Sequence, residues 1–155
     1  RPIYFTPNAI TLSDQIQLVI RFYGEADEIH HNYDFVHATN YYDLKEDRLV
    51  LYPEALESLL TKELRYVGSV YPLTSVLRAK KFIKRGWTIT AGTHLKILWQ
   101  VSKLNLSDIR VLEEQLIGVD IAYFSLLIEA LRTVEDKSKL DNYNFISEII
   151  DRVFN

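Results

Sequence analysis

Asn32-Tyr33-Asp34-Phe35-Val36-His37-Ala38-Thr39-Asn40 is the stretch around which the rest of the chain is organised. Aromatic and β-branched residues dominate it, and the sides alternate from Tyr33 through Phe35 to His37, which predicts a β-strand. Asp34 lies inside this apolar stretch, and burying a carboxylate costs free energy unless it gains a partner or a metal ion. Asp34 is therefore a candidate functional acid. The more ordinary alternative is that Asp34 serves as a cap or turn residue near the start of the strand.

Composition narrows the class of protein. The 155 residues suffice for one domain or two small ones, and 48% hydrophobic with 25% charged residues is ordinary globular usage. A net charge of −3 means that any binding of nucleic acid or phosphate must come from a local patch. The absence of cysteine excludes disulfides, thiolate metal sites and a cysteine nucleophile. No apolar run of about 18 residues occurs, so we expect no membrane span.

The chain begins at Arg1-Pro2-Ile3 without an apolar signal-peptide segment, and it contains no methionine. We interpret it as the later part of a longer protein, or as the ordered part of one.

Secondary-structure patterns change near residue 70. Before it, alternating and β-branched segments predict strands at 3–5, 9–12, 16–23, 33–42 and 48–52, with short helices at 25–31 and 53–60. After it, the helical period predicts helices at 72–85, 91–104, 107–117, 119–135 and 142–154. This order predicts an α+β fold in which a small antiparallel or mixed β-sheet precedes a helical bundle. The expected parts are a β-rich part at 1–70 and a helical domain at 71–155.

A run of cations marks the helix expected at 72–85. Arg78, Lys81 and Arg85 are spaced i, i+3 and i+7 and share one face, with Lys80 and Lys84 beside them. Such a positive ridge suits a triphosphate or the phosphates of RNA. A solvated charged face on an amphipathic helix explains the same run equally well. Trp87 and Trp99 are expected to be core or interface aromatics.

Two motifs resemble the poly(A) polymerase and tRNA CCA-adding branch of the nucleotidyltransferase superfamily. Asp34-Phe35 matches the strand that carries that family's third carboxylate, and the segment from Leu77 to Phe82 matches its Leu-Arg-Ala-x-basic-Phe helix. The order of 8–12, 16–20 and 33–35 is similar to that of phage-encoded members. The sequence departs from the family at several positions, notably Tyr33, Val36 and Tyr71.

The resemblance implies transfer of a nucleoside monophosphate from an NTP to a hydroxyl of RNA or protein, with Mg²⁺, in the cytoplasm of a bacterial host. Asp34 would be a catalytic residue and metal ligand, and Arg78, Lys81 and Arg85 would hold the phosphates or the acceptor. The family's glycine-rich loop and Asp-x-Asp strand do not occur in this chain, so these residues cannot catalyse the reaction alone.

Two alternatives stay open. The first is a degenerate nucleotidyltransferase scaffold that binds a partner protein, in a virion or a host-targeting complex, with the C-terminal helices as the contact. The departures at Tyr33, Val36 and Tyr71 favour it. The second is a nucleic-acid-binding helical module that uses only the basic ridge, whose binding would weaken steeply with salt and would not need Asp34.

Overall fold

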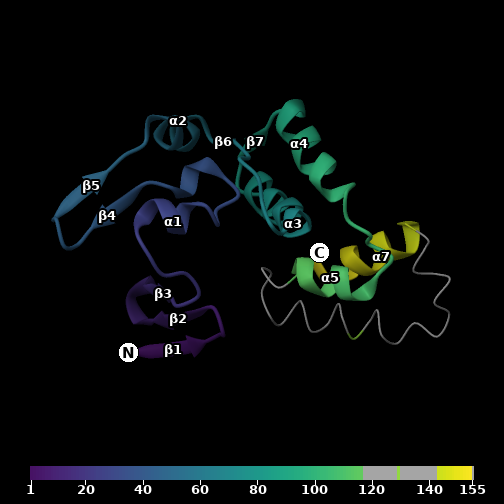
Figure 1. Cartoon of the computed structure of the whole chain (residues 1–155), viewed down its shortest axis with the longest axis horizontal. Helices are drawn as coiled ribbons and strands as arrows, with labels where there is room; N and C mark the ends of the chain where they lie inside the picture. Colours follow the sequence, from purple (N-terminus) through teal and green to yellow (C-terminus); the bar gives the residue numbers. More distant parts are fainter. Residues whose placement is uncertain (117–128, 130–142, 155) are drawn as a thin grey trace. The chain divides into compact units, whose positions relative to one another are not determined.

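The structure is a computed structural model that describes residues 1–116, 129 and 143–154 (Figure 1). The chain divides into two compact units, Arg1–Tyr33 and Asp34–Asn155. Small sheets, mostly antiparallel, and several helices confirm the predicted α+β class. The helix expected at 119–135 lies outside the described residues, and the division into parts 1–70 and 71–155 stays a prediction.

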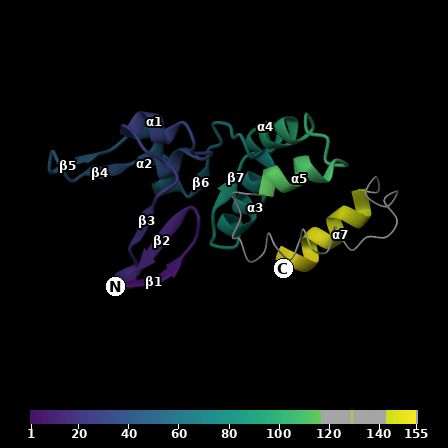
Figure 2. The ribbon, with the colours of Figure 1, turned by 60° about the horizontal axis from the view of Figure 1, so that its bottom comes forward.

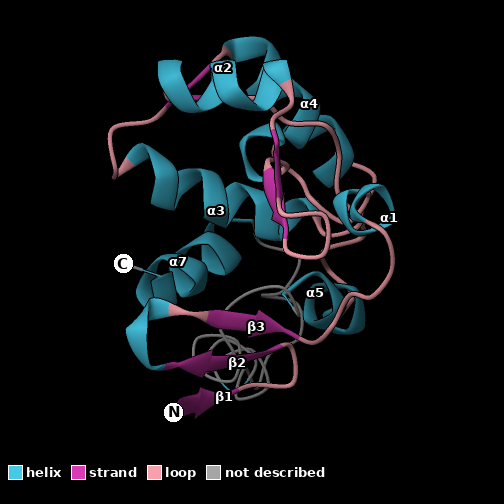
Figure 3. Cartoon of the chain, turned by 90° about the vertical axis from the view of Figure 1, so that its left-hand side faces the viewer, coloured by secondary structure: helices cyan, strands magenta, loops and turns pink. Residues whose placement is uncertain are grey.

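The first unit contains a three-stranded antiparallel sheet in the order β1-β2-β3 (Figure 3). Its strands are β1 (Pro2–Phe5), β2 (Ala9–Leu12) and β3 (Gln17–Val19), followed by helix α1 (Ala26–His30). The register sets Phe5 opposite Ile10, and Ile10 opposite Leu18. Strands β2 and β3 form a hairpin, with a 3-10 turn at Ser13–Gln15 between them.

Strand β3 is shorter than the strand predicted at 16–23. The last ladder bond runs from the Ile20 amide to the Asn8 carbonyl, at 2.9 Å. Beyond Asn8, the segment that would pair with β3 reaches Pro7, which has no N–H to donate, so pairing ends there. The α1 helix then begins at a capping box in which the Glu25 amide donates to Glu28 Oε2 at 2.9 Å.

The second unit carries the remaining elements (Figure 2). A 3-10 turn, η2 (Val36–Ala38), precedes the hairpin of β4 (Tyr41–Asp43) and β5 (Arg48–Val50). A parallel pair joins β6 (Glu63–Leu64) to β7 (Thr88–Ile89). The helices are α2 (Pro53–Thr61), α3 (Pro72–Ile83), α4 (Ala91–Val101), α5 (Ile109–Leu116) and α7 (Tyr143–Phe154). Helices α2 and α3 both start at a proline, whose fixed φ suits a first helical turn.

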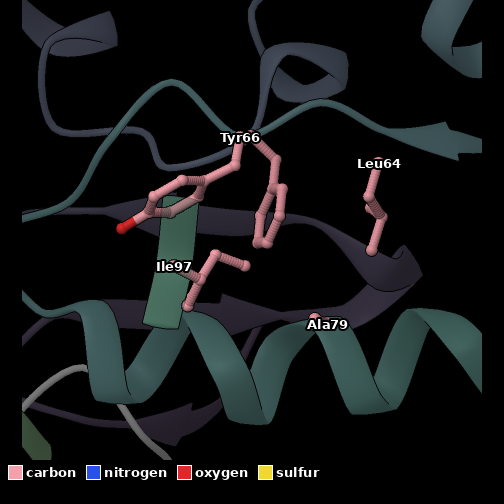
Figure 4. Packing of buried hydrophobic residues seen from close by; sticks show 5 residues of the cluster. Leu64, Tyr66, Ala79 and Ile97 are labelled. Carbon is pink, nitrogen blue, oxygen red and sulfur yellow. The ribbon is translucent and has the colours of Figure 1, made fainter. Parts of the chain in front are cut away.

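A hydrophobic cluster forms the centre of the second unit (Figure 4). Its buried members come from four places: Phe35, Leu64 with Tyr66, Ala79 of α3, and Ile97 of α4. Partly buried side chains of Phe82, Trp87, Ile89 and Val101 pack around it. The stretch at 32–40 therefore contributes to the core through Phe35, which is 1% exposed.

The prediction of a strand at 33–42 is wrong. Phe35 makes a single antiparallel bridge with Tyr66, in which the Val67 amide donates to the Asp34 carbonyl and the Val36 amide to the Arg65 carbonyl, each at 3.0 Å. The chain then turns, because Thr39 donates to the Val36 carbonyl through its amide at 3.1 Å and its hydroxyl at 2.8 Å. Local bonds of this kind compete with a ladder, and extended pairing resumes only at Tyr41.

Candidate functional site

Asp34 is the centre of a polar cluster at the edge of this core. Its residue is 7% exposed, and its Oδ2 accepts hydrogen bonds from Ser75 Oγ at 2.8 Å and from Arg78 Nη1 at 2.7 Å. The Arg78 side chain is 40% exposed, so this ion pair reaches from a buried carboxylate to the surface. Charge-assisted bonds of this length offset the desolvation of the carboxylate.

Local structure explains how the cluster forms. The bridge between Phe35 and Tyr66 fixes the backbone of Asp34, since the Asp34 carbonyl accepts from the Val67 amide. Ser75 and Arg78 are three residues apart on α3 and therefore lie on the same side of the helix. The cluster thus joins the segment after α1 to α3.

Two titratable side chains adjoin this cluster. Burial raises the pKa of Tyr66, and the negative charge of Asp34 adds to the rise. The Tyr66 hydroxyl donates to Oε1 of Gln100 on α4. Burial lowers the pKa of His37, and Asp34 opposes that shift only in part. The His37 ring lies 4.6 Å from both the Phe82 and the Trp87 ring centroids, and its Nδ1 has no hydrogen-bond partner among the described residues.

The other predicted phosphate-binding residues lie at the surface. Lys81 and Arg85 are exposed, and the Arg85 guanidinium lies 5.8 Å from the centre of the Phe82 ring. Their neighbour Lys80 is 3.9 Å from Asp151 of α7. The structure thus brings Arg78 to Asp34 and keeps Lys81 and Arg85 in solvent. Sequence reasoning missed Ser75, whose only signal was its place three residues before Arg78.

The residues available for a metal ion are few. Among residues 1–116, 129 and 143–154, no group of three or more His, Cys, Asp or Glu side chains is placed to hold one. The Asp34 carboxylate is engaged by Ser75 and Arg78. A Mg²⁺ ion at Asp34 would need ligands from beyond these residues, and this cofactor stays a prediction, as does a catalytic role for Asp34.

Comparison with known proteins points to a family of phage proteins. The family model described as "Gabija anti-defense 2 family protein" matches residues 1–62. The chain is also similar to a curated protein, "Gabija anti-defense 2" of Bacillus phage SPbetaL7, with 21% identity over 141 residues. The match covers 90% of this chain and 33% of that protein, so the chain spans about one third of its relative's length. No solved structure matches the chain.

These findings correct the resemblance drawn from the two motifs. The similarity is to an anti-defense family, and neither match identifies a nucleotidyltransferase, so the predicted transfer of a nucleoside monophosphate is wrong. NTP and RNA as partners rested on the same resemblance and have no support. The structure accounts for both motifs by packing, because Asp34 pairs with Arg78 while Phe35 and Ala79 share the core. Short motifs that meet in a core reflect packing as readily as catalysis.

From the sequence we expect no membrane span. Within the described residues, none of the helices is both long enough and apolar enough to cross a bilayer.

Proposed function

We propose that this chain is the protein-binding part of a phage anti-defense protein, and that it acts in the cytoplasm of the bacterial host by contacting a protein of the Gabija defense. The observation that carries the proposal is the similarity to the curated anti-defense protein over 90% of the chain. The match of residues 1–62 to the family model agrees with it.

The surface supports a role in binding proteins. Large apolar side chains are exposed on the β4–β5 hairpin, where Leu44 is 88% and Leu49 58% exposed. They are exposed again on α4, where Trp99 is 71% exposed. Clustered exposed apolar groups mark interaction sites, because leaving them in water forgoes about 25 cal/mol per Å². In this proposal the pair of Asp34 and Arg78 holds the framework that presents such groups.

Plating efficiency tests the proposal. The protein, at the length its gene encodes, is expressed in bacteria that carry the Gabija defense, and these cells are challenged with a phage that the defense blocks. We expect plaques to return, and we expect the defense protein to co-purify with the tagged protein. Cells without Gabija are the control, where plating should not change. Unchanged plating in defended cells, with the protein expressed and folded, contradicts the proposal.

A further inference from the structure

Helix α4 presents an apolar face to solvent. Leu95, Leu98 and Trp99 are 64%, 53% and 71% exposed and follow the i, i+3, i+4 spacing of one helix face. Ile97, on the opposite side, is 1% exposed and packs in the central cluster. The helix therefore has an apolar stripe on each side, and only the stripe of Ile97 is covered.

The helix is held firmly from its buried side. Thr90 caps its start by accepting from the Thr93 amide at 3.2 Å. Gln100, near its end, accepts from the Tyr66 hydroxyl and from the Ser69 amide at 3.3 Å. On the outer face, a Cβ added at Gly92 would meet no atom within 4 Å. A fixed helix with an open apolar face needs little further ordering to bind a partner, which lowers the entropy cost.

The stretch of sequence that contains α4 carries positive charges and no negative ones. From Leu64 to Ser107 the sequence holds eight Lys and Arg and no Asp or Glu, whereas the remaining residues hold ten Lys and Arg and all 21 Asp and Glu. Arg65, Arg78 and Lys80 of this segment pair with acids from outside it. Lys96 on α4 and Lys103 in the following turn are exposed. Lys96 lies three residues before Trp99 and therefore beside it on α4, and Lys103 follows just after the helix ends at Val101.

From this arrangement we propose that the outer face of α4 docks an acidic segment of a partner protein. Apolar side chains of that segment pack on Leu95, Leu98 and Trp99, and its carboxylates face Lys96 and Lys103. This inference rests on the proposed function and names the surface and the partner's chemistry. Two exposed leucines favour a protein over a nucleic acid, because phosphates gain nothing from them, and tryptophan is among the residues that most often dominate protein interfaces.

A random library of 16-residue peptides, displayed on phage and selected on the protein, tests the surface. We expect selected peptides to be rich in Asp and Glu and to carry Leu, Phe or Trp at helical spacing. Binding of a selected peptide should weaken roughly tenfold or more in Trp99→Ala, since tryptophans at interface centres have effects of this size. Lys96→Glu with Lys103→Glu should weaken it as well, and more so at low salt.

Leu60→Gln with Lys62→Glu is the matched control, since it changes an exposed leucine and an exposed lysine at the end of α2. It should leave peptide binding unchanged, and circular dichroism should show every variant folded. Three results overturn the inference: selection yields no acidic apolar peptides, binding survives Trp99→Ala, or a 20-nucleotide RNA binds through Lys96 and Lys103 without need of Trp99. Self-association that Trp99→Ala abolishes also overturns it, because the occupant is then a second copy.

The plating assay separates this inference from the proposed function. Wild-type protein that restores plaques while Trp99→Ala restores them equally well leaves the proposed function standing and removes the α4 surface. Wild-type protein that fails to restore plaques removes the proposed function, whatever the peptides do. Loss of plaques in Trp99→Ala, with the α2 control unaffected, supports both.

Discussion

Helices α3 and α4 are neighbours of nearly equal length, yet they are used differently. Six of the twelve residues of α3 are buried, among them Ser75 and Ala79, whereas α4 buries only Ile97 of its eleven. Helix α3 packs against α4, β7 and α5, and its polar side chains hold Asp34. Helix α4 is covered on one side only.

The contrast teaches that apolar content alone does not reveal burial. Helix α4 exposes two leucines and a tryptophan to solvent, while α3 buries a serine and a threonine. Buried polar residues with partners mark α3 as a structural element, since an unpaired one would be costly. Exposed leucines and a tryptophan mark α4 as a surface for contact.

Within α4, the two faces give the largest difference in stability. Ile97→Ala removes a side chain that packs in the central cluster, so we expect a loss of about 2–5 kcal/mol in the free energy of unfolding. Leu98→Ala, one residue away and 53% exposed, should change it by less than about 1 kcal/mol. Urea unfolding followed by circular dichroism measures both. Equal losses would mean that the outer face is covered after all.

Overpacking tests how tightly α3 is enclosed. Ala79→Leu adds a bulky side chain where the alanine is 3% exposed, so we expect a loss of about 1–3 kcal/mol. Val76→Leu is the matched change at a residue that is 37% exposed on the same helix, and it should be nearly neutral. Thermal unfolding of the two variants provides the measurement. A neutral Ala79→Leu would show that α3 has room beside it.

Removal of the arginine tests the bond from α3 to Asp34. Arg78→Ala leaves the Asp34 carboxylate with Ser75 alone. We expect the free energy of unfolding to fall by about 1–2 kcal/mol, which is less than for a fully buried pair because the Arg78 side chain is 40% exposed. Lys81→Ala, three residues further, removes an exposed cation and should stay within about 0.5 kcal/mol. Asp34→Asn in the Arg78→Ala background should recover part of the loss. Chemical unfolding compares the series, and equal effects at 78 and 81 would remove the pair from the framework.

Acid sensitivity from His37 is the smallest expected effect. Its pKa is lowered by burial, so the folded state binds fewer protons than the unfolded state as the pH falls below 6.5. This contribution to stability is present at pH values above the pKa of the unfolded state, and it is lost as the pH falls toward the pKa of the folded state. The melting temperature of wild type should therefore drop more between pH 7.5 and 5 than that of His37→Phe. His94→Gln, an exposed change on α4, should follow wild type, and parallel curves for all three would exclude His37.

Part of the fold could be predicted because its signals are local. The hairpin of β2 and β3 follows from polar turn residues between β-branched segments, and the starts of α2 and α3 follow from Pro53 and Pro72. The strand expected around Asp34 failed because strand pairing depends on a distant partner, and Tyr66 supplies one bridge only. Thr39 then closes a turn that alternation of side chains does not reveal.

The candidate site was predictable in its residue types and not in its connections. Asp34 and Arg78 stand out as an acid in an apolar stretch and a cation in a ridge, but the ion pair that joins them across 44 positions is a tertiary fact. The exposure of Trp99 depends on which side of α4 meets the core. Both sides carry apolar residues, so the sequence pattern does not reveal that the side of Ile97 is the buried one. Motif resemblance misled because the two motifs meet in the core.

The parallel pairing of β6 with β7 has a consequence for truncation. Leu64 and Tyr66 precede α3 in the chain, whereas Ile97 follows it, and all three meet in one cluster. A fragment that starts at residue 71 would leave Ile97 without two of its neighbours and would expose the edge of β7. Shortened versions that begin at Asp34, where the second unit starts, keep Phe35 and both halves of this packing, and they are the ones we expect to fold.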